Sequence, residues 1–279
     1  MKTQIRRKFK IILTIMLAII IGTSIAQTRV KGNGKVITEE RNTGNFTGIK
    51  LTCSADLIIS QGSTSVTVKT DENILKFIST KVKDGTLEIG VKKDGFRSAT
   101  TLEVHISIPN LESIKSLGSG DIDFKGTFKA KDLFIANSGS SDIDGNFDVT
   151  NLELKMNGSG DIDLEGIFGT FKVFSSGSGD LEAEGLKLEE CYVKCSGSGD
   201  IELNGKANNL TVTISGSGDV SAYNLTTVNA IVNSSGSSDV TLNVVEKLQA
   251  RLSGSGDVTY RGNAKADVTS RGSGEVYKK

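Results

Sequence analysis

The sequence of 279 residues has no Trp, one His, one Pro and three Cys. With only four Tyr as well, we expect few aromatic platforms on which bases or sugar rings could stack. Lys plus Arg and Asp plus Glu both number 33, so no overall charge favours nucleic acid or an anionic membrane. We therefore expect no nucleic-acid partner.

The residues that usually carry catalysis are also few. The one histidine, His105, alternates with Val104 and Ile106, which predicts an outward side chain on a strand. The repeated Ser residues lack a general base in any recognisable arrangement. Gly-Ser-Gly here precedes an expected strand and not a helix N-terminus, so it does not predict a phosphate-binding loop. We predict a protein that is not an enzyme, with no catalytic, cofactor-binding or established metal residues.

The three cysteines do not predict a disulfide framework. Cys191 and Cys195 are four residues apart in an expected strand, so they lie roughly 13 Å from each other and cannot bridge. Their positions in the repeat are apolar or small in other copies, so both are interpreted as small buried hydrophobic residues.

The first 26 residues resemble a secretory signal peptide. Five basic residues between Lys2 and Lys10 precede an apolar run from Ile11 to Ile21. Ser24-Ile25-Ala26 supplies small residues for cleavage after Ala26. The alternative is an uncleaved anchor, but this run of eleven residues falls short of the roughly 20 that span a bilayer. We expect export and no transmembrane segment after cleavage.

A short motif, Gly118-Ser119-Gly120-Asp121, and close variants of it occur in nine copies at intervals of about 19 residues. The acidic residue that ends each copy is called position zero here. A constant step of this size is typical of a solenoid, in which each unit buries its apolar side against its neighbours. The acidic residues are Asp121, Asp142, Asp161, Asp180, Asp200, Asp219, Asp239, Asp257 and Glu275.

Apolar residues occupy positions plus one, minus seven and minus nine of almost every copy. These odd positions predict inward side chains on two short strands per coil, and the even positions predict outward ones. Gly at minus three predicts one corner, because Gly adopts positive φ and lets coils stack closely. A second corner is expected near plus five. The pattern predicts an all-β, single-stranded, right-handed parallel β-helix over residues 117–279.

Residues 27–116 are strand-rich without a regular repeat. Asp84-Gly85 separates two alternating runs and predicts a hairpin turn. Ser54-Ala55-Asp56-Leu57 resembles a degenerate copy of the later motif. We interpret this region as an irregular β cap continuous with the helix, and a separate small β-sandwich is the alternative.

The eight Asp residues at position zero form the candidate site. In stacked coils their carboxylates would lie about 5 Å apart, and like charges directly opposed are unfavourable. One hypothesis is that each Asp accepts hydrogen bonds from turn amides, with Lys115, Lys155 and Lys194 lying across the corner. A second is that the row binds Ca²⁺, which prefers carboxylate oxygens. A third is that this flat face docks a partner or a glycan.

Several motifs, in their order along the chain, resemble the head GIN domain family, described as putative auto-transporter adhesins. They are Phe46-Thr47-Gly48-Ile49-Lys50, Ala55-Asp56-Leu57, Gln61-Gly62, Asp71-Glu72-Asn73, Gly85-Thr86-Leu87, Pro109-Asn110-Leu111 and Gly118-Ser119-Gly120-Asp121. The resemblance implies an exported β-helical protein of a Gram-negative envelope with a role in adhesion. An auto-transporter also needs a C-terminal membrane barrel, whereas this sequence is still within a repeat at Lys279, so we do not expect self-export.

The leading functional hypothesis is a secreted, non-enzymatic cell-envelope adhesin of the periplasm or cell surface. It would bind a surface, glycan or protein partner along its flat sides. The alternatives are a polysaccharide lyase or hydrolase and a structural spacer. The edge of the last coil also predicts homo-oligomers that associate end to end.

Overall fold

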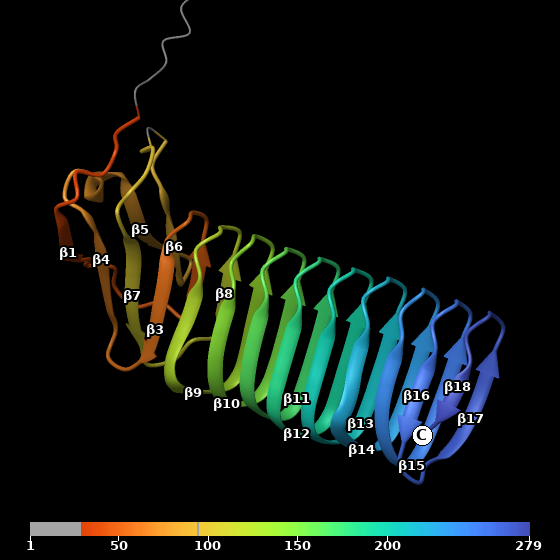
Figure 1. Ribbon diagram of the computed structural model, residues 1–279. Coiled ribbons are helices and arrows are strands. Elements are labelled where there is room, and N and C mark those ends of the chain that lie inside the picture. Colours follow the sequence, from red (N-terminus) through yellow and green to blue (C-terminus); the bar gives the residue numbers. More distant parts are fainter. Residues whose placement is uncertain (1–28, 94) are drawn as a thin grey trace, which may run out of the picture.

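The computed structural model describes residues 29–93 and 95–279. The predicted signal peptide, residues 1–26, lies outside this part of the chain. The described residues form one sheet of 18 strands and one short 3-10 helix, η1 (Leu75–Phe77), which confirms the all-β prediction (Figure 1). Within these residues, no helix has the length and hydropathy to cross a membrane.

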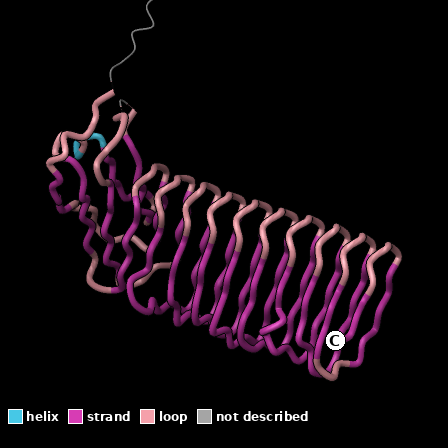
Figure 2. Tube along the Cα trace, in the orientation of Figure 1, coloured by secondary structure: helices cyan, strands magenta, loops and turns pink. Residues whose placement is uncertain are grey.

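The repeated part of the chain winds into a solenoid whose long strands each follow almost one coil (Figures 1 and 2). Each strand pairs in parallel with the next coil, so that Ile122 lies beside Ile143 and Ile143 beside Ile162. The predicted parallel β-helix is confirmed. The strands are β9 (Ile122–Asn137), β10 (Ile143–Met156), β11 (Ile162–Ser175), β12 (Leu181–Cys195), β13 (Ile201–Ile214), β14 (Val220–Ser234), β15 (Val240–Leu252), β16 (Val258–Arg261), β17 (Lys265–Ser270) and β18 (Val276–Lys278).

The N-terminal region joins the same sheet. In it, β2 (Gly48–Leu51) pairs in parallel with β8 (Ser113–Ser116), and β3 (Asp56–Gln61) pairs in parallel with β9. The other strands, which make antiparallel pairs, are β1 (Val36–Glu40), β4 (Ser65–Asp71), β5 (Ile78–Lys83), β6 (Thr86–Val91) and β7 (Leu102–Ile108). The predicted hairpin joins β5 to β6, and φ is +48° at Asp84 and +72° at Gly85.

Several coils, among them those of β12 and β14, have three inward-facing segments, where the sequence predicted two strands. In β12 the alternation of buried and exposed residues breaks at Gly185 and again at Glu189-Glu190, while the strand itself continues. The extra middle segment was missed because the coils vary in length there, so its apolar residues keep no constant position. The three buried groups of β12 are Leu181 with Ala183, Leu186 with Leu188, and Cys191 with Val193 and Cys195.

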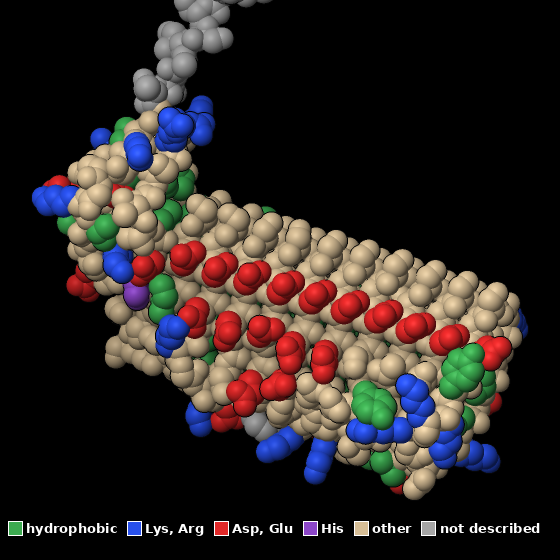
Figure 3. Space-filling view, viewed as in Figure 1, with side chains coloured by type: hydrophobic (Ala, Val, Ile, Leu, Met, Phe, Trp, Pro, Cys, Tyr) green, Lys and Arg blue, Asp and Glu red, His purple; other side chains and the backbone are tan. Residues whose placement is uncertain are grey.

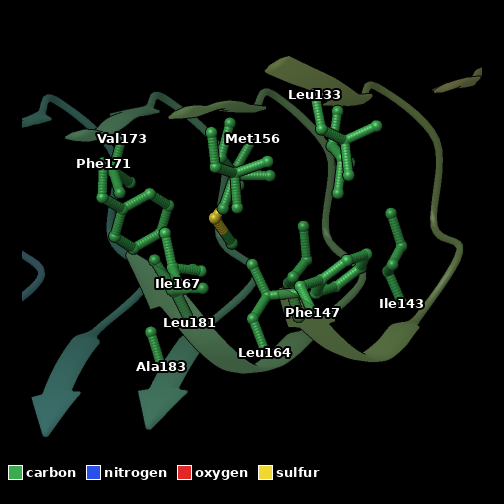
Figure 4. Packing of buried hydrophobic residues seen from close by; sticks show 14 of the residues in the cluster. Leu133, Ile143, Phe147, Met156, Leu164, Ile167, Phe171, Val173, Leu181 and Ala183 are labelled. Carbon is green, nitrogen blue, oxygen red and sulfur yellow. The ribbon is translucent and has the colours of Figure 1, made fainter. Parts of the chain in front are cut away.

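The core consists of continuous stacks of aliphatic and aromatic side chains between the sides of the coils (Figure 4). The predicted columns at plus one, minus seven and minus nine are buried from the first regular coil to the coil that contains β15. In the last coil Val268, at minus seven, is 44% exposed. The end-to-end association predicted for this end stays a prediction.

The glycines at the two corners serve different purposes. At minus three, a Cβ on Gly158 would lie 1.8 Å from the carbonyl oxygen of Gly139 in the preceding coil, so only Gly allows this close stacking. The prediction of positive φ at minus three was wrong, since positive φ occurs instead at the second corner, for example +63° at Gly185. The backbone amides of the Gly-Ser-Gly turn donate to the coil before, which draws the coils together at this corner.

Candidate functional site

The Asp residues at position zero lie in one exposed row along the solenoid, with Asp257 half-buried (Figure 3). Oδ1 of each Asp accepts a hydrogen bond from the backbone amide at position zero of the next coil. The distance is 2.8 Å from the amide of Asp161 to Asp142, and 2.8 Å from the amide of Asp200 to Asp180. The row begins at Asp56 in the N-terminal region, whose Oδ1 accepts the amide of Asp121 at 3.1 Å.

These carboxylates therefore continue the backbone hydrogen bonding of the sheet across the turn. The carbonyl of each position-zero residue accepts the amide of plus one in the preceding coil, as in Asp161 to Ile143 at 3.0 Å. The amide of the same residue would otherwise face solvent at the end of the turn. The short Asp side chain supplies the acceptor oxygen for this amide. As a consequence, the carboxylates of neighbouring coils lie only about 4.8 Å apart.

The Asp row can be tested at Asp180, whose Oδ1 accepts the amide of Asp200. We expect Asp180→Ala to lower the free energy of unfolding by about 1 kcal/mol, the usual net value of one hydrogen bond. Asp180→Asn keeps an acceptor oxygen and removes a repelling charge, so it should be at least as stable as the parent protein. Urea unfolding of both variants measures this, and equal losses for Ala and Asn would contradict a hydrogen-bonding role.

A second acidic row lies two residues after the first, over the first five coils, and is also visible in Figure 3. It consists of Asp123, Asp144, Asp163, Glu182 and Glu202, which lie beside one another in register. Partial burial and the charges of Asp144, Asp161 and Asp142 raise the pKa of Asp163. Partial burial and Glu184, Glu202 and Asp163 raise the pKa of Glu182. Both directions mean that the charged forms of Asp163 and Glu182 are less favourable in the folded protein than in the unfolded chain.

The raised pKa values of Asp163 and Glu182 predict a contribution to stability from these two residues that rises as the pH falls. A carboxyl whose pKa is raised in the folded state binds more protons there than in the unfolded chain, so acid stabilises the fold as the pH drops through the folded pKa. We expect Glu182→Gln to raise the melting temperature at pH 7 and the advantage to shrink towards the ordinary pKa of 4.5. Melting curves between pH 7 and pH 4 measure this. An advantage that stays constant with pH would contradict it.

In residues 29–93 and 95–279, no group of three or more His, Cys, Asp or Glu is arranged to hold a metal ion. The Ca²⁺ hypothesis for the Asp row stays a prediction. His105 lies on the outer side of β7, where its ring is 3.0 Å from the carboxylate of Glu103. Lys69 and His105 together lower the pKa of Glu103, which makes this cluster an ion-pair group on the N-terminal region.

A groove crosses the last segments of β9 to β13, on a different side of the coil from the acidic rows. It has two parts, of about 690 and 570 Å³, which share Thr170 and Lys172. The first part is lined by Asn110, Glu112, Lys131, Asp132, Leu133, Phe134, Asn151, Leu152, Glu153, Thr170 and Lys172. The second is lined by Thr170, Lys172, Val173, Phe174, Glu190, Tyr192, Val193, Lys194, Thr211 and Thr213. We call this surface the groove face.

Two lysines beside the groove face contact its aromatic rings. Lys155 Nζ lies 5.1 Å from the ring centre of Phe134 and 5.8 Å from that of Phe174. Lys115 Nζ lies 5.7 Å from the ring centre of Phe134. These lysines thus contact aromatic rings, and Lys155 also forms an ion pair with Glu153. Cation–π contacts of this kind orient both partners.

Sequence reasoning missed the aromatic side chains of this face. Phe134 and Tyr192 occupy position minus eight, and Phe174 occupies minus six, both of which face outward. Their even positions in the repeat predict outward side chains, and this was the signal in the sequence. Because aromatic residues are scarce in the chain as a whole, their clustering on one face was not recognised. The few outward aromatic side chains of the chain thus include three that lie together on this face.

Comparisons with known proteins agree with the fold. A structure called a putative lipid binding protein from Parabacteroides distasonis ATCC 8503 is 24% identical, with a TM-score of 0.66 over 90% of this chain and 99% of that one. A putative adhesin from Parabacteroides merdae ATCC 43184 is 22% identical, with a TM-score of 0.66 over 90% and 98%. A putative adhesin from Parabacteroides distasonis ATCC 8503 is 22% identical, with a TM-score of 0.68 over 90% and 99%. At these identities the likeness shows the fold alone.

A search of curated proteins finds no match. The family model described as "Putative auto-transporter adhesin, head GIN domain" matches residues 45–204 and 189–264, which is most of the solenoid and its cap. The resemblance seen in the motifs is confirmed. The chain belongs to the head GIN domain family of putative auto-transporter adhesins.

Proposed function

We propose that this protein is an exported, adhesin-type protein of the cell envelope that binds an extended partner without changing it chemically. The partner lies along the groove face, and the protein resides in the periplasm or on the cell surface. The family description supports a role in adhesion. The observation that carries the proposal is the groove itself, whose two parts share Thr170 and Lys172 and together are lined by the last segments of five consecutive strands.

The shape and lining of the groove suit binding better than catalysis. It is shallow and long, and its side chains come from regular coils that hold them at fixed spacing. Binding surfaces of repeat proteins extend along the solenoid in this way. A hydrolase or lyase would need an acid and a base that converge on one bond, with shifted pKa values. Of the four groove carboxylates, Asp132, Glu153 and Glu190 are instead engaged by Asn151, Lys155 and Tyr192. The fourth, Glu112, accepts a hydrogen bond from Asn110.

The proposal is tested by measuring binding and turnover on the same material. Purified protein is incubated with intact bacterial cells and with extracted surface polysaccharides, and bound protein is measured alongside released reducing ends and unsaturated products. We expect saturable binding, recovery of intact ligand and no released product. Turnover would replace the proposal with a polysaccharide-processing enzyme, and absence of binding to every surface would favour a structural spacer.

A further inference from the structure

We propose that the groove face binds an acidic polysaccharide, with sugar rings stacked on Phe174 and Tyr192 and sugar carboxylates paired with Lys172 and Lys194. This inference rests on the proposed function and names its ligand class. Nothing in the family description assigns a ligand.

The four side chains form a square on two neighbouring coils. Lys172 pairs in register with Tyr192, and Phe174 pairs in register with Lys194. Each aromatic ring therefore has a lysine beside it on the adjacent strand, about 4.8 Å away at the backbone. A pyranose ring has an apolar face that packs on an aromatic side chain, and a carboxylate at its rim would reach the neighbouring lysine.

The lysines of the square are available for a ligand. Lys172 and Lys194 are exposed, and no carboxylate in the described part of the chain lies within ion-pair distance of either. By contrast, Glu190 already accepts the hydroxyl of Tyr192 at 3.0 Å and the amide of Asn209 at 2.9 Å. The positive charges are unpaired and the nearby negative charge is engaged, so the square favours an anionic ligand.

The Tyr192 ring is held in place while still exposed. Its hydroxyl donates to Glu190, which raises the pKa of Tyr192, and 40% of the residue remains exposed to solvent. A ring that is fixed before binding loses little conformational entropy on contact with a ligand. In the next coil Thr211 lies beside Tyr192 and Thr213 beside Lys194, which places hydroxyl groups where sugar hydroxyls would extend.

The groove favours a polymer over a small molecule or a lipid surface. Its two parts join at Thr170 and Lys172 and continue along the solenoid, and the coil spacing repeats the same backbone geometry at each step. The aromatic rings of the groove are separated by polar and charged side chains, so they do not form the continuous apolar patch that insertion among lipid chains requires.

The test uses polygalacturonate as the acidic polymer and the same polymer with its carboxylates reduced to alcohols. Titration calorimetry at low salt should show at least tenfold tighter binding to polygalacturonate than to the reduced polymer. The double variant Lys172→Gln with Lys194→Gln should lose about tenfold in affinity for polygalacturonate, and the loss should shrink at high salt because exposed charges are screened. Phe174→Ala should lose about tenfold with both polymers.

Two controls distinguish a loss of binding from a loss of folding and from a general effect of removing surface charge. Lys206→Gln removes an exposed lysine of β13 outside the groove and should change affinity by less than twofold. Melting curves establish that each variant remains folded. Equal affinity for the two polymers, unchanged affinity of the double lysine variant, or binding to anionic phospholipid vesicles alone would overturn the inference. If cells still bind in those cases, the proposed function stands and only its ligand class is wrong.

Discussion

Replacement of Gly177 by Ala is expected to lower the free energy of unfolding by at least about 3 kcal/mol or to prevent folding. A Cβ at this position would lie 1.9 Å from the carbonyl oxygen of Gly158 and 3.0 Å from the carbonyl carbon of Asn157. Both are backbone atoms, so no side chain can move aside and the coils themselves must separate. The shift would break the turn hydrogen bond from the amide of Ser178 to the carbonyl of Gly158.

Gly126→Ala provides the matched control for Gly177→Ala. Gly126 lies at the second corner with φ of +72°, and a Cβ there would meet nothing within 4 Å. Its replacement should cost only about 1 kcal/mol, the usual penalty of a left-handed conformation for Ala. Urea unfolding followed by circular dichroism, with limited proteolysis, measures both variants. Equal losses of unfolding free energy in the two variants would show that backbone conformation, and not close stacking of coils, requires Gly at position minus three.

Replacement of Phe171 by Ala should cost about 3 to 5 kcal/mol. Phe171 is fully buried and lies in register between Leu152 and Cys191 of the neighbouring coils. The coils on both sides are fixed by their backbone ladders, so they cannot collapse into the space and a cavity remains. Because each coil of a solenoid contacts only its neighbours, the loss of stability should be confined to the interfaces of the coil that contains Phe171.

Phe174 provides the control on the same strand, three residues later. Its ring is half-exposed on the groove face, and Phe174→Ala should cost about 1 kcal/mol or less, chiefly from the lost contact with Lys155. Hydrogen exchange and urea unfolding should therefore distinguish the two phenylalanines clearly. A loss at Phe174 that equals the loss at Phe171 would contradict the inward and outward assignment of β11.

The candidate sites show which functional features could be predicted from the sequence and which could not. The Asp row was predicted as a row because its spacing is in the sequence, and Asp56 was recognised as an early copy. The partner of each carboxylate could not be predicted, since the amide that it binds belongs to the next coil and depends on how the turn is oriented. The groove face was missed, because Phe134, Phe174 and Tyr192 are distributed over three different repeats.

The sequence by itself determined the parallel β-helix, since apolar residues at constant odd positions allow only one way of stacking coils of about 19 residues. It also determined where the Gly-Ser-Gly corner lies. Only the tertiary structure decided that several coils have a third segment and that close stacking alone, without positive φ, requires the glycines at minus three. It alone brought aromatic and lysine side chains into one groove. The physical reason is that contacts between coils join residues about 19 positions apart, and local periodicity carries no information on which outward side chains meet there.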